Sequence, residues 1–166
     1  RVDRRQRQMC IRDRYKDELL DNVLPFWLEH SQDHEYGGYF TCLDREGKVF
    51  DTDKFIWLQS REVWMFSMLY NKVENRQEWL DCAIQGGEFL KKYGHDGDYN
   101  WYFSLDRSGR PLVEPYNIFS YTFATMAFGQ LSLATGNQEY ADIARKTFDI
   151  ILSKVNNPKG KWNKLH

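Results

Sequence analysis

The chain has 166 residues, of which 42% are hydrophobic and 16% aromatic, and its formal net charge is −1. This length is sufficient for one domain with a buried core. The near-neutral charge provides no basic field for a nucleic-acid partner, and no apolar run is long enough to cross a membrane.

The first fourteen residues, RVDRRQRQMCIRDR, contain six arginines and two aspartates, which gives a segment charge of +4. One interpretation is a basic arm for nucleic acid, but nothing downstream supports it. The amino-acid sequence of this segment also resembles translated sequencing-adapter read-through. We therefore expect residues 1–14 to be a non-native segment and residues 15–166 to be part of the domain.

Residues 16–30 carry apolar side chains at helical spacing, and Pro25 is expected to kink this helix or to mark its late start. Gly37 and Gly38 then indicate a turn. Residues 39–50 predict a short hairpin around the sequence DREG.

Asp51, Thr52 and Asp53 are candidate N-caps for a helix over residues 55–72. That helix is apolar nearly all round, which predicts burial on most sides. The next helix, over residues 77–93, is amphipathic and needs a partner on one side only.

The same pattern then returns. A second hairpin is predicted over residues 101–113 around DRSG, followed by an apolar helix over 115–135 and an amphipathic helix over 138–155. The hairpin copies YFTCLDREGKV and YFSLDRSGRPL, aligned on Leu43 and Leu105, lie 62 residues apart.

This unit of hairpin, buried helix and amphipathic helix predicts an all-α fold with two concentric rings of helices, an α/α barrel. An α-solenoid is the alternative. Two units and one further helix cannot close a ring, so we expect the chain to form part of a larger domain.

The motifs D-x-x-x-G-G (33–38), Y-F-T-C-L (39–43) and W-L-Q-x-R (57–61) resemble the N-terminal part of the N-acylglucosamine 2-epimerases, also described as renin-binding proteins. The resemblance implies an (α/α)6 barrel, a small-molecule sugar substrate, and relatives that epimerise cellobiose or isomerise mannose. It also implies that no cofactor is required, that ATP can act as an allosteric effector, and that the full-length protein can form a homodimer.

Arg61 breaks the repeat, because the 62-residue offset aligns it with Phe123. A guanidinium in a core position needs a carboxylate or a polar cavity. Trp57, Arg61 and Trp64 share one helix face, which is typical of a sugar site. The alternative is a structural arginine paired with Glu62 or another carboxylate. The resemblance associates the arginine of W-L-Q-x-R with the active site and so implies a catalytic Arg61.

Epimerisation at C2 removes a proton next to the aldehyde of the open sugar and returns one to the opposite face. A fixed cation would stabilise the enediolate-like intermediate. The acid and base should be histidines, which the resemblance places in the C-terminal half of the family. His30 and His34 could resemble a metal pair, but the glycines that follow favour a turn and no metal.

Tyr39, Phe103 and Tyr121 are further candidates for the sugar-binding cavity, although core packing explains them equally well. The cysteines, Cys10, Cys42 and Cys82, lack a CxxC spacing, which favours reduced thiols and a cytoplasmic location.

Two other functions stay open. A glycoside hydrolase on a similar toroid would need two carboxylates facing the cavity, and a non-catalytic barrel would bind a protein partner.

Overall fold

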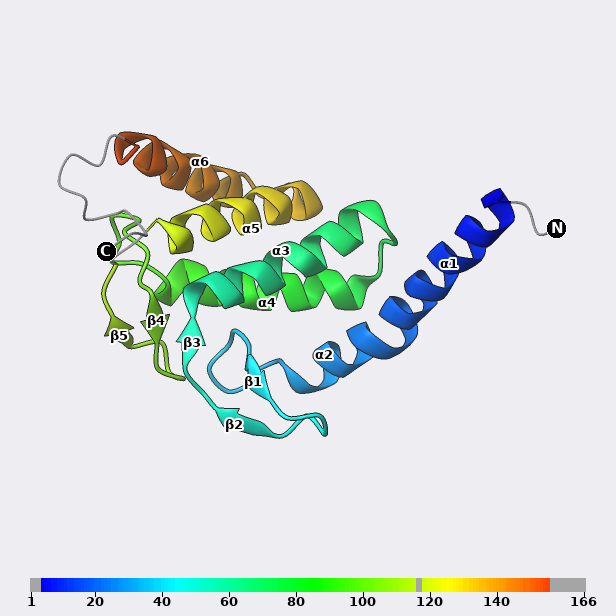
Figure 1. Ribbon diagram of the computed structural model, residues 1–166. Coiled ribbons are helices and arrows are strands. Elements are labelled where there is room, and N and C mark those ends of the chain that lie inside the picture. The colour runs from blue at the N-terminus through cyan, green and yellow to red at the C-terminus, as the bar shows by residue number, and fades with distance from the viewer. Residues whose placement is uncertain (1–3, 116–117, 156–166) are drawn as a thin grey trace.

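The computed structural model describes residues 4–115 and 118–155, which form helices connected by short strands (Figure 1). The helical segments are α1 (Arg4–Glu18), the π-helical η1 (Leu19–Val23), α2 (Leu24–His30), α3 (Ile56–Lys72), α4 (Gln77–Tyr93), α5 (Phe119–Thr135) and α6 (Gln138–Ser153). The strands are β1 (Cys42–Leu43), β2 (Val49–Asp51), β3 (Lys54–Phe55), β4 (Ser104–Leu105) and β5 (Pro111–Val113). A mainly helical fold with hairpins ahead of the inner helices is therefore confirmed.

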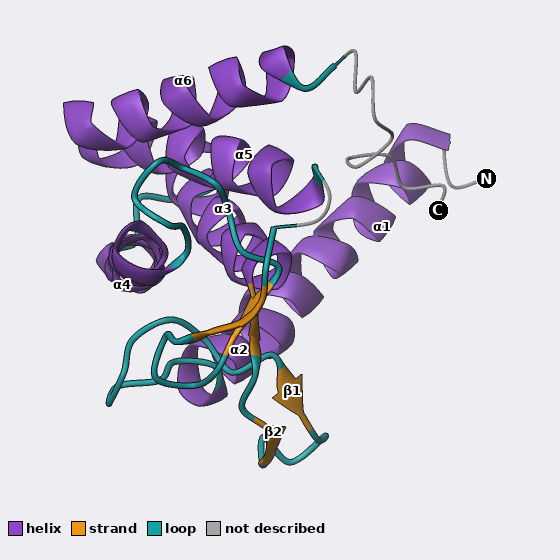
Figure 2. Ribbon diagram, turned by 90° about the vertical axis from the view of Figure 1, so that its left-hand side faces the viewer, coloured by secondary structure: helices purple, strands orange, loops and turns teal. Residues whose placement is uncertain are grey.

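The helices form two layers. α3 and α5 pack along each other, α4 packs against α3, and α6 packs against α5. Figures 1 and 2 show the same order, with α6 on the outer side of α5. The apolar helices of the sequence thus form the inner layer and the amphipathic helices form the outer layer.

Burial follows the sequence pattern. α4 buries one face, on which Trp79, Cys82, Ala83 and Leu90 are almost completely inaccessible. α3 and α5 bury residues on several sides, including Ile56, Val63 and Phe66 in α3 and Ala124, Phe128 and Leu131 in α5. None of the helices in the described ranges is both long and apolar enough to cross a membrane.

Both hairpins are confirmed, and the structure adds a strand that the sequence did not predict. β1 pairs antiparallel with β2, and β4 pairs antiparallel with β5. β3 pairs antiparallel with β4, with Lys54 opposite Leu105. This strand ties the chain entering the first inner helix to the second hairpin.

The expected N-caps of the first inner helix are wrong. The N-cap of α3 is Phe55, which has extended backbone geometry and no capping side chain. The Ile56 amide instead donates to the Phe103 carbonyl at 3.0 Å. Because β3 leads directly into α3, the neighbouring hairpin supplies a partner for one of the free amides of the helix start.

The first helix changes its hydrogen-bond pattern just before Pro25, which lies in the first turn of α2. The Leu24 amide donates to the Leu19 carbonyl, the longer spacing of a π-turn. Pro25 thus coincides with a change in the helical hydrogen-bond pattern. Upstream of it, α1 extends from Arg4, and its residues 9–18 are exposed.

The last two helices end close to where the sequence predicts. Gly136, at φ 69°, follows α5, as the Gly-Asn stop signal indicates. α5 begins at Phe119, later than the expected 115, and residues 116–117 lie outside the described ranges. α6 ends at Ser153, two residues before the expected end at Val155.

The repeat also holds in buried hydrogen bonds. The Tyr39 hydroxyl donates to the Cys82 carbonyl in α4 at 2.7 Å. At the equivalent position, Trp101 donates through Nε1 to the Thr147 hydroxyl in α6 at 3.1 Å. In each unit, a buried aromatic from the loop before the hairpin therefore anchors the following outer helix.

Candidate functional site

Arg61 lies at the contact between the two inner helices. Its guanidinium carbon is 5.9 Å from the ring centroid of Trp57 and 5.9 Å from that of Phe123. The two ring centroids lie 6.0 Å apart, so the cation and the two rings form a triangle, with one ring from α3 and the other from α5. The position that breaks the repeat thus lies next to its own repeat partner.

Within the described residues, Arg61 forms no ion pair and no hydrogen bond, and its side chain is exposed. The alternative in which Arg61 pairs with Glu62 is wrong, because the Glu62 carboxyl group contacts Ser31 instead. The aromatic rings hold the guanidinium through cation–π contacts, which leave its N–H donors available to a ligand.

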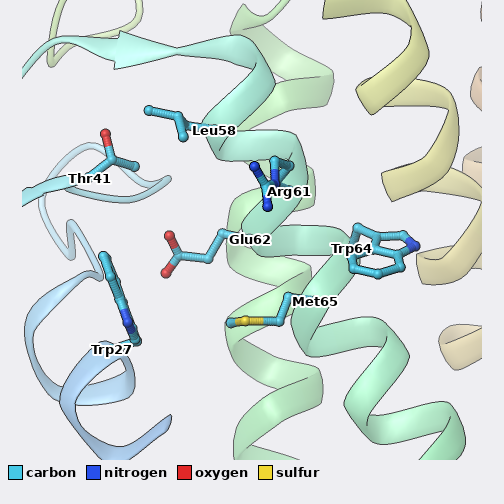
Figure 3. Close-up of a pocket in the computed structure, with 7 residues that line it drawn as sticks. All are labelled: Trp27, Thr41, Leu58, Arg61, Glu62, Trp64 and Met65. Atoms are coloured by element: carbon cyan, nitrogen blue, oxygen red, sulfur yellow. The ribbon is translucent and has the colours of Figure 1, made fainter. Parts of the chain in front are cut away.

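A pocket of about 350 Å³ opens beside Arg61, between α3, the end of α2 and the first hairpin (Figure 3). Its walls are mostly apolar, and Arg61 and Glu62 are its two ionisable lining residues. The lining residues are Trp27, Thr41, Leu58, Arg61, Glu62, Trp64 and Met65.

Glu62 is a buried acid in this pocket, with 8% of its surface exposed. The oxygen atoms of Ser31 Oγ and Glu62 Oε1 lie 2.5 Å apart. Burial raises the pKa of Glu62 to about 8, because a buried carboxylate loses its hydration. Burial therefore favours the protonated form of this group.

A second charged cluster lies in the loops before the inner helices, and the sequence did not predict it. The buried Asp33 carboxylate accepts from Lys54 Nζ at 2.9 Å. It also accepts from Arg107 Nε at 2.9 Å and from Arg107 Nη2 at 3.1 Å. The cluster joins the D-x-x-x-G-G loop, β3 and the second hairpin turn.

The electrostatics of the cluster are those of a structural anchor. Burial acts to raise the pKa of Asp33, but the hydrogen bonds from Arg107 and Lys54 outweigh it and hold this pKa at about 2. Lys54 is completely buried, and its Nζ also donates to the carbonyls of Gly37 and Arg107. With all three ammonium donors committed, Lys54 is not available to a ligand.

The repeat contained one signal for this cluster. Arg107 aligns with Arg45 in the copies DRSG and DREG. Arg45 is exposed, whereas Arg107 reaches the carboxylate. No sequence pattern marked Lys54, because a two-residue strand carries no periodicity.

The six site residues predicted from the sequence separate into two groups. Trp57, Arg61 and Trp64 share one face of α3. Tyr39 is completely buried, and its hydroxyl and amide bond to Cys82 and Gln59.

The other two aromatic candidates also lie apart from this face. Tyr121 is buried; its hydroxyl donates to Asn100 Oδ1 at 3.3 Å and accepts from Lys154 at 2.9 Å. The ring of Phe103 meets Phe55 edge-on, with centroids 5.6 Å apart. Both residues have structural contacts at these positions.

The histidines are not grouped in one site. His34 is exposed, and His30 lies against Phe26 at 4.9 Å between ring centroids. His95 stacks on Tyr99 in the loop after α4, and burial lowers its pKa. No cluster of three metal-ligating side chains occurs in residues 4–115 and 118–155, and His166 lies outside the described ranges.

Comparison with known proteins identifies relatives for most of the chain. The family model for N-acylglucosamine 2-epimerase (GlcNAc 2-epimerase) matches residues 38–165. The N-acylglucosamine 2-epimerase of Mus musculus is 45% identical over 143 residues, which cover 84% of this chain and 34% of the relative. A cellobiose 2-epimerase of Ruminococcus albus is 31% identical over 139 residues, covering 82% of this chain and 35% of the relative.

Solved structures agree. A sugar epimerase from a ruminal bacterium matches with a TM-score of 0.79 and 28% identity, covering 86% of this chain and 36% of that one. The cellobiose 2-epimerase of Bacillus thermoamylovorans matches with a TM-score of 0.78 and 27% identity, covering 90% and 38%. The two layers of helices are thus part of an (α/α)6 barrel, and the solenoid alternative is wrong.

The chain spans about a third of the length of the curated relatives that it matches. Within that third lie the Arg61 face of α3, the pocket beside it and the Asp33 cluster. The family model covers most of the chain, and the repeat, the motifs and the fold agree with it. The chain therefore belongs to the N-acylglucosamine 2-epimerase family.

Proposed function

We propose that this chain supplies one wall of the active site of a sugar 2-epimerase that interconverts N-acylglucosamines and N-acylmannosamines. The observation that carries the proposal is the exposed Arg61 guanidinium, which contacts two aromatic rings and has no carboxylate partner among the described residues. In the part of the chain that the structure describes, the N–H donors of Arg61 have no structural partner.

The chemistry of C2 epimerisation requires such a group. A base removes the C2 proton of the open sugar, the electron pair moves toward the carbonyl oxygen, and an acid returns a proton to the opposite face of C2. The intermediate is an enediolate-like anion. Arg61 keeps its charge at any working pH, and its planar fork can donate two parallel hydrogen bonds to the developing charge.

Trp57 and Trp64 complete this wall in the proposal. Their rings are partly exposed on the face that carries Arg61, and aromatic rings of this kind pack against the C–H faces of sugars. Tyr39, Phe103 and Tyr121 are not included, because each has the structural contacts described above. The acid and base would come from other parts of a complete barrel, where the resemblance places two histidines.

The choice of substrate class rests on the relatives. Those named N-acylglucosamine 2-epimerase are 44–45% identical to this chain, whereas those named cellobiose 2-epimerase are 27–31% identical. We infer an amino sugar as the substrate on that difference. A cytoplasmic location is inferred from the cysteines, of which all three are free in the structure.

A chimeric enzyme tests the proposal. Residues 15–165 of this chain would replace the aligned segment of the Mus musculus N-acylglucosamine 2-epimerase. The chimera would be assayed with N-acetylglucosamine, N-acetylmannosamine and cellobiose. We expect turnover of both amino sugars and much slower turnover of cellobiose.

The parent mouse enzyme is the control for the assay, and circular dichroism with size-exclusion chromatography is the control for folding. A chimera that folds like the parent but turns over neither amino sugar would contradict the proposal. Faster turnover of cellobiose than of the amino sugars would keep an epimerase but overturn the substrate class.

A further inference from the structure

The contacts of Ser31 determine where one buried proton lies. Ser31 Oγ is 2.6 Å from the Trp27 carbonyl oxygen and 2.5 Å from Glu62 Oε1. Oxygen atoms this close need a hydrogen between them. A serine hydroxyl has one hydrogen, and the carbonyl has none. The second hydrogen must therefore belong to Glu62.

We propose that Glu62 is a positioning residue that acts as a neutral acid: its O–H donates to Ser31, holds the end of α2 against α3, and leaves the charge of Arg61 uncompensated. The residue next to the site cation is thus a hydrogen-bond donor and not a counter-ion. The consequence for catalysis rests on the proposed function, whereas the protonation state stands on the contacts of Ser31.

The surroundings of Glu62 support a neutral group. Its carboxyl group points to the side of the pocket formed by Trp27 and Thr41 (Figure 3). Burial raises its pKa to about 8. The facing titratable groups are the Tyr39 hydroxyl and the Cys82 thiol, whose pKa values are also raised, mainly by burial and in part by Glu62. Neither group gains charge between pH 6 and pH 9. Among these three groups, a titration step in that pH range would therefore belong to Glu62.

The protonation state of Glu62 changes the electrostatic potential at the site where the reaction intermediate would form. An ionised Glu62 would place a negative charge beside Arg61 and would oppose the anion that forms during epimerisation. A neutral Glu62 leaves the potential at the site positive. Activity should therefore fall as pH rises through the pKa of Glu62.

The direct test is an NMR titration of the 166-residue chain with ¹³C-labelled glutamate carboxyl groups, in which Glu62→Gln identifies the signal. We expect a midpoint near 8 for Glu62, well above the ordinary glutamate value of about 4.3. A Glu62 midpoint below pH 6 would overturn the proposal.

Ser31→Ala determines the direction of the hydrogen bond. If Glu62 donates to Ser31, the bond stabilises the neutral acid, and its loss should lower the midpoint by roughly 0.5–1 pH unit. If Ser31 donates to a carboxylate, the midpoint should rise instead, which would contradict the proposal.

Because Ser31→Ala can weaken folding, urea unfolding of the original chain and Glu62→Gln provides a second test. As the pH rises from 5 to 8, the free energy of unfolding of the original chain should fall relative to that of the Gln variant. Equal pH dependence of the two proteins would also contradict the proposal.

The chimeric enzyme supplies a readout that a purely structural role would not change. Its kcat should show an alkaline step at the Glu62 midpoint, and the Glu62→Gln profile should lack that step. An alkaline step that persists in the Gln variant would contradict the link to Arg61. An inactive chimera would count against the proposed function, whereas the titration decides the state of Glu62 in either case.

Discussion

Arg61 and Phe123 occupy equivalent positions in the two units, and the structure places their side chains next to each other. Adjacent inner helices present the same face toward the same side. The aromatic ring of the second unit therefore packs against the cation of the first. Such a contact contributes roughly 0.5–1 kcal/mol at an exposed position, too little to make Arg61 a folding residue.

In contrast to Arg61, Asp33 stabilises the fold, and it does so through residues that are distant in the sequence. Lys54 and Arg107 lie 21 and 74 positions away from it. The D-x-x-x-G-G motif was visible in the sequence, but the partners of its aspartate were not. No local pattern records a contact across that distance, whereas the Arg61 exception was visible because the repeat supplied a comparison.

Asp33→Asn should destabilise the chain by on the order of 3 kcal/mol, because it leaves the buried Lys54 ammonium without its counter-charge. Urea unfolding at pH 7 measures this loss. Asp81→Asn, on the exposed face of α4, is the control and should change stability by less than about 0.5 kcal/mol.

The pH dependence of Asp33 has a definite sign. Its folded pKa of about 2 lies below the unfolded value of about 3.9. The contribution of this group is therefore complete above about pH 4 and is lost as pH falls toward 2. The original chain should lose stability over that range more steeply than Asp33→Asn. Parallel curves for the two proteins would show that the cluster does not hold the loops together.

At the scale of elements, sequence periodicity predicted the helices but not the way in which they begin. α4 matches the predicted range of residues 77–93, because its amphipathic pattern repeats over several turns. β3 was missed and the N-caps of α3 were wrong for one shared reason. Lys54 and Phe55 pair with β4 of the second hairpin, about 50 positions downstream, and that pairing takes the place of a cap.

The close approach between the Tyr39 ring and α4 can be tested with two glycines. A β-carbon at Gly86 would overlap the Tyr39 hydroxyl, whereas one at Gly129 in α5 would meet nothing within 4 Å. Gly86→Ala should therefore destabilise the chain by about 1–3 kcal/mol. Gly129→Ala should stabilise it by roughly 0.5–1 kcal/mol, since alanine favours a helix interior.

Thermal or urea unfolding of the two variants measures this difference directly. Both substitutions add one methyl group inside a helix, so they differ mainly in what the methyl group meets. Equal effects of the two substitutions would contradict the packing of the Tyr39 loop against the outer helix.

At the scale of the whole molecule, the repeat predicted the architecture because each unit buries its helices against the next one. The open faces follow from the same geometry. Met126 and Leu133 in α5, and Phe148 and Leu152 in α6, are exposed apolar side chains. The sequence alone left ring and solenoid as alternatives, since two units fit both. The match to barrel structures decided between them.

The helix that precedes these units gives a prediction at the same scale. Residues 9–18 of α1 are exposed, and the ion pair from Lys16 to Glu74 is long at 3.9 Å and solvated. Removal of residues 1–14 should therefore change the free energy of unfolding by less than about 1 kcal/mol. Urea unfolding of residues 15–166 and of the original chain makes the comparison, and a large loss would make this segment part of the domain.

The central claim is that Arg61 serves the chemistry and not the fold, and kcat/KM of the chimeric enzyme with Arg61→Ala tests it most directly. We expect a loss of roughly 10²–10³-fold with the unfolding midpoint nearly unchanged, little recovery in Arg61→Lys, and no loss in the exposed control Arg45→Ala. A variant Arg61→Ala that unfolds, while its soluble fraction keeps nearly full activity, would contradict the claim and make Arg61 a structural residue.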